Sequence, residues 1–171
     1  MIVNKSIEDL MEELGGYVSL IEYVISNIGN WKEERTKSRE LTGITDSTFD
    51  QISKKIMEQL CSSGVGLHNG YIVDVFEEAL ANSVGHGNNY DASVITSIKV
   101  IKCNYGFIIR VRDSGMGFNP TEIARKRKEG EDGSFRYMGE GFRLFKESGV
   151  PISFENGGTT INIALYKSPS G

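Results

Sequence analysis

The stretch EEALANSVGHGNN, residues 77–89, spaces three polar side chains four residues apart: Glu78, Asn82 and His86. Residues four apart share one face of a helix, so these would form a polar stripe. The amide oxygen of Asn82 is a hard ligand suited to Mg²⁺, and the carboxylate of Glu78 could hold or deprotonate a water or hydroxyl. A solvated helix face would have the same pattern. His86 is expected to have a structural role at the helix end.

A second group of candidate residues lies in VRDSGMGF, residues 111–118. A strand would end at Asp113 and deliver its carboxylate to the rim of a sheet. Gly115 and Gly117 would let the backbone pass close to a flat ligand. A carboxylate can accept a hydrogen bond from the exocyclic amine of adenine, whereas an ordinary Asp-Gly turn is the structural alternative.

The third group is GEGFRLF, residues 139–145. Gly139 and Gly141 are expected to precede a helix, where free backbone N–H groups can bind phosphate. Glycine is also common at helix boundaries without any ligand. The chain has no GxxxxGK[ST] motif, and Leu144 occupies the third glycine position of a dinucleotide fingerprint, so neither of these phosphate motifs is present.

The helix that would carry the polar stripe is predicted at residues 71–86, from the helical spacing of its apolar side chains. Its other face should pack on a sheet. The residues expected on this buried face are Ile72, Val75, Phe76, Ala79, Leu80 and Val84.

Two hairpins are predicted to supply that sheet. Residues 92–113 alternate as two strands that turn at 104–106, and residues 151–167 form a second pair that turns at 156–158. A short helix is expected between the hairpins, at 139–149. Helices on one face of a mixed, mostly antiparallel sheet make a two-layer α/β sandwich.

The first third of the chain, residues 1–65, is predicted to be mostly helical. Apolar residues occur at helical spacing on both sides of a break at Gly15 and Gly16, and a further helix is expected between Ser47 as N-cap and Gly64 as stop. These extra N-terminal helices would pack as an extension on the domain formed by residues 66–171.

The composition narrows the class of protein. A chain of 171 residues suits a single globular unit, and a net charge of -4 with a pI of about 5.3 gives no electrostatic reason to expect nucleic acid as a partner. No apolar run approaches the roughly 18 residues of a membrane helix, and the first ten residues do not resemble a signal peptide. A cytoplasmic location is therefore expected. Cys61 and Cys103 are expected to be reduced thiols.

The three motifs in this order resemble those of a known family. ExxxN followed by HG, then DxGxGF, then GxGF are similar to the N, G1 and G2 boxes of the GHKL (Bergerat-fold) ATPases, over roughly residues 70–167. EALANSVGHGNN and the ending GGTTINIALYK resemble, in particular, the anti-sigma-factor serine kinases. The longer run before the N box and Phe142 in the G2 box depart from that branch.

The resemblance implies a Bergerat fold that binds ATP with Mg²⁺. Glu78 would be the general base, Asn82 the magnesium ligand, and Asp113 the acceptor for the adenine amine. Residues 119–138 would form the ATP lid. The resemblance also implies that Gly115 and Gly117 line the adenine pocket, that Thr160 assists there through a water, and that Gly139 and Gly141 face the phosphates. Phe118 and Phe142 are the further cofactor-binding residues that it implies.

The function that the resemblance implies is a serine/threonine protein kinase that transfers the γ-phosphate of ATP to a serine of a small antagonist protein. A sigma factor and a second copy of the chain are further implied partners, whereas nucleic acid and membranes are not expected. Two alternatives stay open: a nucleotide-dependent partner-binding module without kinase activity, and a histidine-kinase-like catalytic domain acting on a separate chain. His68 lies in a glycine-rich segment, which argues against self-phosphorylation on histidine.

Overall fold

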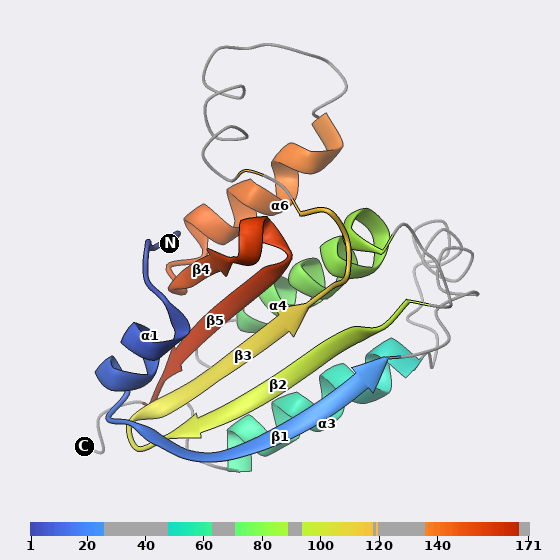
Figure 1. Cartoon of the computed structure of the whole chain (residues 1–171). Coiled ribbons are helices and arrows are strands. Elements are labelled where there is room, and N and C mark those ends of the chain that lie inside the picture. Colours follow the sequence, from blue (N-terminus) through green and yellow to red (C-terminus); the bar gives the residue numbers. More distant parts are fainter. Residues whose placement is uncertain (26–47, 63–70, 89–93, 118, 120–135, 168–171) are drawn as a thin grey trace.

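The computed structural model describes residues 1–25, 48–62, 71–88, 94–117, 119 and 136–167 (Figure 1). Five strands in these residues form an antiparallel sheet in the order β1-β2-β3-β5-β4. The elements are α1 (Ile7–Glu13), β1 (Tyr17–Ile25), α3 (Thr48–Ser62), α4 (Tyr71–Asn82) continued by a π-helical turn (Ser83–Gly87), β2 (Thr96–Cys103), β3 (Gly106–Arg112), α6 (Arg136–Glu147), β4 (Ile152–Glu155) and β5 (Thr160–Tyr166).

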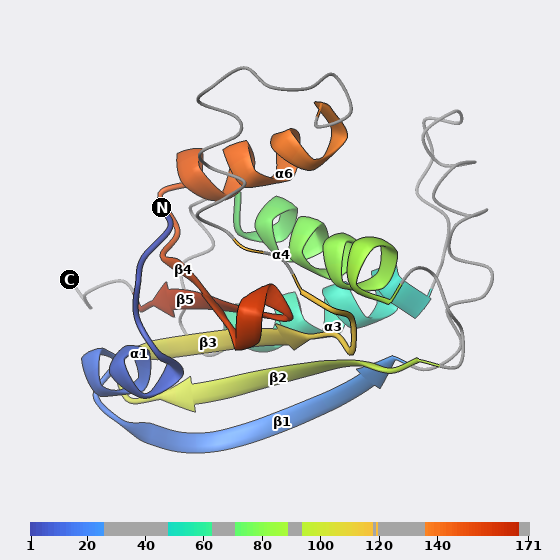
Figure 2. The same ribbon diagram turned by 45° about the horizontal axis from the view of Figure 1, so that its top comes forward.

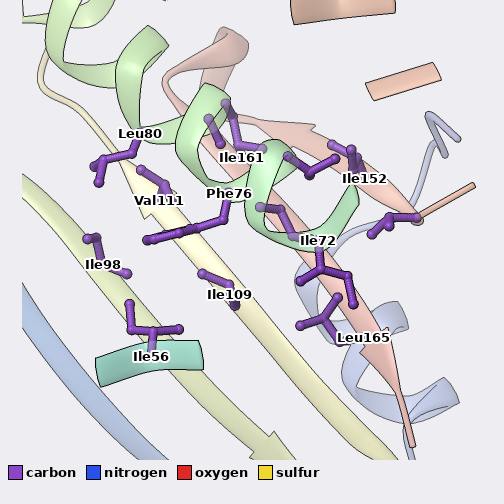
Figure 3. Close-up of a cluster of buried hydrophobic side chains, with 14 of the residues drawn as sticks. Ile56, Ile72, Phe76, Leu80, Ile98, Ile109, Val111, Ile152, Ile161 and Leu165 are labelled. Carbon is purple, nitrogen blue, oxygen red and sulfur yellow. The ribbon is translucent and has the colours of Figure 1, made fainter. Parts of the chain in front are cut away.

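One face of the sheet is covered by a layer formed by α3, α4 and α6, with α4 and α6 above the strands in Figure 2. Successive strand residues point to opposite faces, and every second residue of β3, such as Ile109 and Val111, enters the core under α4 (Figure 3). The predicted buried face of α4 is confirmed. All six residues expected there are at most 5% exposed: Ile72, Val75, Phe76, Ala79, Leu80 and Val84.

Both predicted hairpins are confirmed. β2 and β3 are joined by a tight turn at Asn104 and Tyr105, and β4 and β5 by a short turn at Asn156–Gly158. In the second turn Asn156, Gly157 and Gly158 all have positive φ angles, a conformation that glycine adopts without steric penalty and asparagine tolerates. The mixed α and β composition with a largely antiparallel sheet therefore agrees with the predicted sandwich.

The prediction for residues 17–25 was wrong. This segment was expected to be helical, but it forms strand β1, which pairs with β2 from Tyr17 opposite Cys103 to Ile25 opposite Thr96. The segment YVSLIEYVI is rich in β-branched and aromatic residues, which favour a pleated surface. The first third of the chain is thus not only helical, because it contributes one strand to the same sheet.

The sequence predicted that all the helices lie on one face of the sheet, but α1 lies on the other face. Leu10 and Leu14 of α1 pack with Ile101, Ile108 and Ala164, and these strand residues alternate with the ones under α4. The helix therefore covers part of the opposite face. It begins with a capping box, in which the side chain of Ser6 accepts the N–H of Asp9 and the Asp9 carboxylate accepts the N–H of Ser6.

Helix α6 is longer than expected. The sequence placed Gly139 and Gly141 before a helix, but α6 begins at Arg136, so both glycines lie inside it. Its first three residues, 136–138, belong to the segment that the resemblance assigned to the ATP lid. Several predicted features lie outside the described residues: Ser47, Gly64, His68, Phe118 and residues 120–135 of the expected lid.

None of the described helices is both long and apolar enough to cross a bilayer.

Candidate functional site

Glu78 and Asn82 lie one turn apart on α4, as the spacing predicted. The Asn82 side-chain nitrogen donates a hydrogen bond of 3.2 Å to Glu78 Oε1, and both residues are partly buried. This hydrogen bond uses the nitrogen of the amide and leaves its oxygen, the atom that a hard cation would bind. His86 lies in the π-helical turn beyond, and its side chain is outside the described residues.

Glu78 also contacts the third motif. A Cβ added to Gly141 of α6 would lie 2.7 Å from Cδ and 2.9 Å from Cγ of Glu78, and closer still to its Oε1. Carbon atoms in contact are normally about 3.5–4.0 Å apart. The side chain of Glu78 therefore rests on the bare backbone of α6, and only glycine at position 141 leaves room for it.

Asp113 follows the last residue of β3, at the rim of the sheet. The residue is only 8% exposed, and its carboxylate accepts the N–H of Gly115 at 2.8 Å on Oδ1. The Asp113 backbone N–H donates to the carbonyl of Thr159 at 3.0 Å, which ties the end of β3 to β5. A Cβ on Gly87 would lie 2.6 Å from each carboxylate oxygen, so the carboxylate lies against the π-helical turn that ends α4.

Burial raises the pKa of the Asp113 carboxyl above its ordinary value, because desolvation disfavours the charged form. The hydrogen bond from Gly115 and the charge of Arg112 act in the opposite direction and oppose the shift. A carboxyl that is desolvated but holds few hydrogen bonds gains from a donor that a ligand would bring.

Contacts within the chain account for both glycines after Asp113. A Cβ on Gly115 would lie 2.8 Å from the Cα of Gly87, and one on Gly117 would lie 2.9 Å from the carbonyl carbon of Gly157. Gly117 also has a φ of 72°, which disfavours other residues. The loop after β3 is therefore folded between the end of α4 and the turn between β4 and β5.

Thr160 is the first residue of β5 and is fully buried. It pairs with Arg112 and Glu155, whereas its neighbour Ile161 enters the core under α4. Its buried hydroxyl accepts a hydrogen bond from the side chain of Asn156. The preceding residue, Thr159, is the one that meets the Asp113 loop: its carbonyl accepts the Asp113 N–H, and its methyl group would lie 3.1 Å from a Cβ on Gly117.

Phe142 has a packing role in this structure. Its ring stacks on Phe154 with centroids 5.5 Å apart and is tilted against Phe145 at 6.5 Å, which anchors α6 to β4. Gly139 lies in the first turn of α6, where backbone N–H groups have no partner within the helix. Phe118, the last residue of the second motif, is outside the described residues.

Sequence reasoning missed Gly87 and Asn88 as members of this site. The end of α4 widens into a π-helical turn, closed by a hydrogen bond from Asn88 N–H to the Ser83 carbonyl at 2.9 Å. Such turns are rare and occur often at functional sites. The run HGNN gave some indication, because it places Gly87 and Asn88 directly after the polar stripe. The contact of Gly87 with Asp113 cannot be predicted from the sequence.

The structure thus gathers the three motifs around α4. Gly87 at its end meets Asp113, and Glu78 within it meets Gly141. In the described part of the chain no group of three or more His, Cys, Asp or Glu side chains could hold a metal ion by itself. Mg²⁺ commonly binds through one or two protein ligands together with phosphate groups and waters.

Comparisons with known proteins leave the family open. No protein-family model matches the chain. No curated protein matches it either.

Proposed function

We propose that this chain is a GHKL-type ATP-binding protein with the Bergerat fold and acts as a protein serine kinase of the anti-sigma-factor type. The observation that carries the proposal is the convergence of the three motifs on α4, through the contacts of Gly87 with Asp113 and of Glu78 with Gly141. These residues are far apart in the sequence, and an unrelated α/β scaffold would have no reason to bring them together.

The nucleotide would lie between the contact of Gly87 with Asp113 and the contact of Glu78 with Gly141. Asp113, partly desolvated, would accept the amine of adenine, with the backbone at Gly115 and Gly117 beside it. Asn82 would contribute its amide oxygen to a magnesium ion shared with the phosphates. The N–H groups in the first turn of α6, which include that of Gly139, suit the phosphate oxygens.

Glu78 is the residue suited to move a proton. Mg-ATP supplies the phosphoryl group and the divalent charge when bound. On this chain Glu78 would accept the proton of an incoming serine hydroxyl, while Asn82 holds the carboxylate in place through their hydrogen bond. Phosphoryl transfer depends mainly on positioning and on charge neutralisation, so this small set of groups is sufficient.

Calorimetric titration with Mg-ATP and Mg-ADP tests the nucleotide site. We expect wild type to bind both and Asp113→Asn to bind at least about tenfold more weakly, because a hydrogen bond to a charged group contributes about 1.5–3 kcal/mol. Asp74→Asn, a change of an exposed acid on α4, is the matched control and should bind like wild type. Absence of binding to folded wild type would refute the nucleotide proposal.

A second measurement separates the kinase from a binding module. With γ-labelled ATP and candidate acceptor proteins, Glu78→Gln should bind nucleotide normally and lose about 10²–10⁴-fold in transfer, the usual contribution of a general base. Label on the acceptor should be stable to acid, as phosphoserine is. Acid-labile label would favour the histidine-kinase-like alternative, and partner binding that responds to nucleotide without any transfer would favour the module.

A further inference from the structure

Asn88 is a buried amide at the end of the π-helical turn, and the roles proposed above do not use it. It is 4% exposed. Its nitrogen donates to Thr96 Oγ1 at 2.8 Å, and its oxygen accepts the backbone N–H of Ser114 at 3.0 Å. One side chain therefore joins the end of α4, the first residue of β2 and the loop that follows β3.

The position of this amide coincides with the end of a strand ladder. Ser97 opposite Arg112 is the last pair between β2 and β3, so the residues beyond it are not held by backbone pairing between these two strands. The Asn88 amide spans this place, with Thr96 on one side and Ser114 on the other. It holds the loop where the ladder no longer does.

The loop held in this way carries Asp113. The residue directly after Asp113 is tied to Asn88, and the residue directly before Asn88, Gly87, lies against the Asp113 carboxylate. Gly115, which donates to that carboxylate, also packs on the backbone of Gly87. A shift of Asn88 would therefore move the surroundings of the carboxylate on both sides.

We propose that Asn88 is a positioning residue for Asp113 and that the affinity of the site for the base of a nucleotide depends on it. This rests on the proposed function. An amide supplies one donor and one acceptor at the required distance, and alanine supplies neither. Loss of the amide would remove the tie on the Ser114 side of the Asp113 loop and leave the tie to Thr159, while Glu78 and Asn82, which have their own hydrogen bond, stay in place.

The test compares two probes that engage different ends of the site, Mg-ADP and Mg-tripolyphosphate, by calorimetry. Asn88→Ala should weaken Mg-ADP by at least about tenfold, the loss of one hydrogen bond to a buried group, and leave Mg-tripolyphosphate unchanged within twofold. Asn104→Ala, which removes an exposed amide in the turn between β2 and β3, is the matched control and should change neither affinity. A merely structural role for Asn88 would weaken both probes alike.

Thr96→Val is the second variant, for use if Asn88→Ala does not fold. It removes the hydroxyl that accepts from Asn88 and changes no residue of the Asp113 loop itself, so we expect a loss of at least about threefold for Mg-ADP alone, part of one hydrogen bond. Equal losses for both probes, or no loss for Mg-ADP, would overturn the positioning role while wild-type binding leaves the nucleotide proposal standing. Wild type that binds neither probe would overturn both.

Discussion

The contact between Glu78 and Gly141 predicts that two substitutions depend on each other. In a helix interior alanine is more favourable than glycine by about 0.5–1 kcal/mol. At position 141, however, the new methyl group would overlap the Glu78 side chain, with its carbon 2.7 Å from Cδ. The Glu78 side chain must then move away from α6.

The cost of that movement follows from the contacts of Glu78. The Glu78 side chain loses the hydrogen bond from Asn82, which contributes about 0.5–1.5 kcal/mol. An off-rotamer side chain costs a further amount of about 0.5–1.5 kcal/mol. Gly141→Ala should therefore leave the free energy of unfolding between unchanged and about 2.5 kcal/mol lower. With Glu78→Ala already present, the same change should instead raise it by about 0.5–1 kcal/mol.

The assay is urea unfolding of wild type, the two single variants and the double variant. The expected coupling energy is about 1–3 kcal/mol. Independent sites deviate from additivity by only about 0.3–0.5 kcal/mol. If Gly141→Ala has the same effect in both backgrounds, the carboxylate of Glu78 does not rest on α6 and the convergence of the first and third motifs is wrong. No ligand or acceptor protein is needed for this measurement.

Three further predictions concern the same fold. Because burial raises the pKa of Asp113 above its ordinary 3.8, the folded protein binds this proton more tightly than the unfolded chain. The free energy of unfolding should therefore fall as pH increases from 3.8 through the raised pKa. Asp113→Asn should lack this fall, and an equal fall for both proteins in urea titrations would contradict the assignment. Glu155 accepts hydrogen bonds from Arg110 and from the N–H of Ile7, and its side chain is 19% exposed. Glu155→Ala should therefore lower the free energy of unfolding by about 1–3 kcal/mol, less than the loss of a fully buried pair. Glu147→Ala, at an exposed pair, should change it by less than about 0.5 kcal/mol, and equal effects of the two variants would refute the difference between the two pairs. Gly87→Ala should lower it by about 1–3 kcal/mol through overlap with Asp113, and wild-type stability would show that the two groups do not touch.

Features that depend on neighbours in the sequence were predicted well. The buried face of α4 follows from spacing along one helix, and both hairpins follow from strand alternation on either side of a turn. The pair Glu78 and Asn82 belongs to this class too, because residues four apart on a helix are neighbours wherever the helix lies.

Features that depend on distant partners were not predicted. Tyr17–Ile25 carries apolar residues on both faces of an edge strand, so its sequence lacks strict alternation. Its β-branched and aromatic residues favour a strand, and the pairing with β2 adds a partner that is distant in the sequence. Gly141 was expected at a helix boundary because glycine is frequent there. In the structure, glycine is required at this position because the Glu78 side chain of α4 packs against it. The hydrogen bonds of Asn88 and Thr159 to the Asp113 loop likewise join residues that are far apart in the sequence.

The position of β1 has a consequence for how the chain folds. The β2–β3 and β4–β5 hairpins close over a few residues, whereas β1 must find β2 across a long loop that includes α3 and α4. The entropy of closing a loop increases with its length, and non-local pairing slows folding. We therefore expect the two hairpins and α4 to form the folding nucleus, and the strand that comes first in the sequence to join the sheet last.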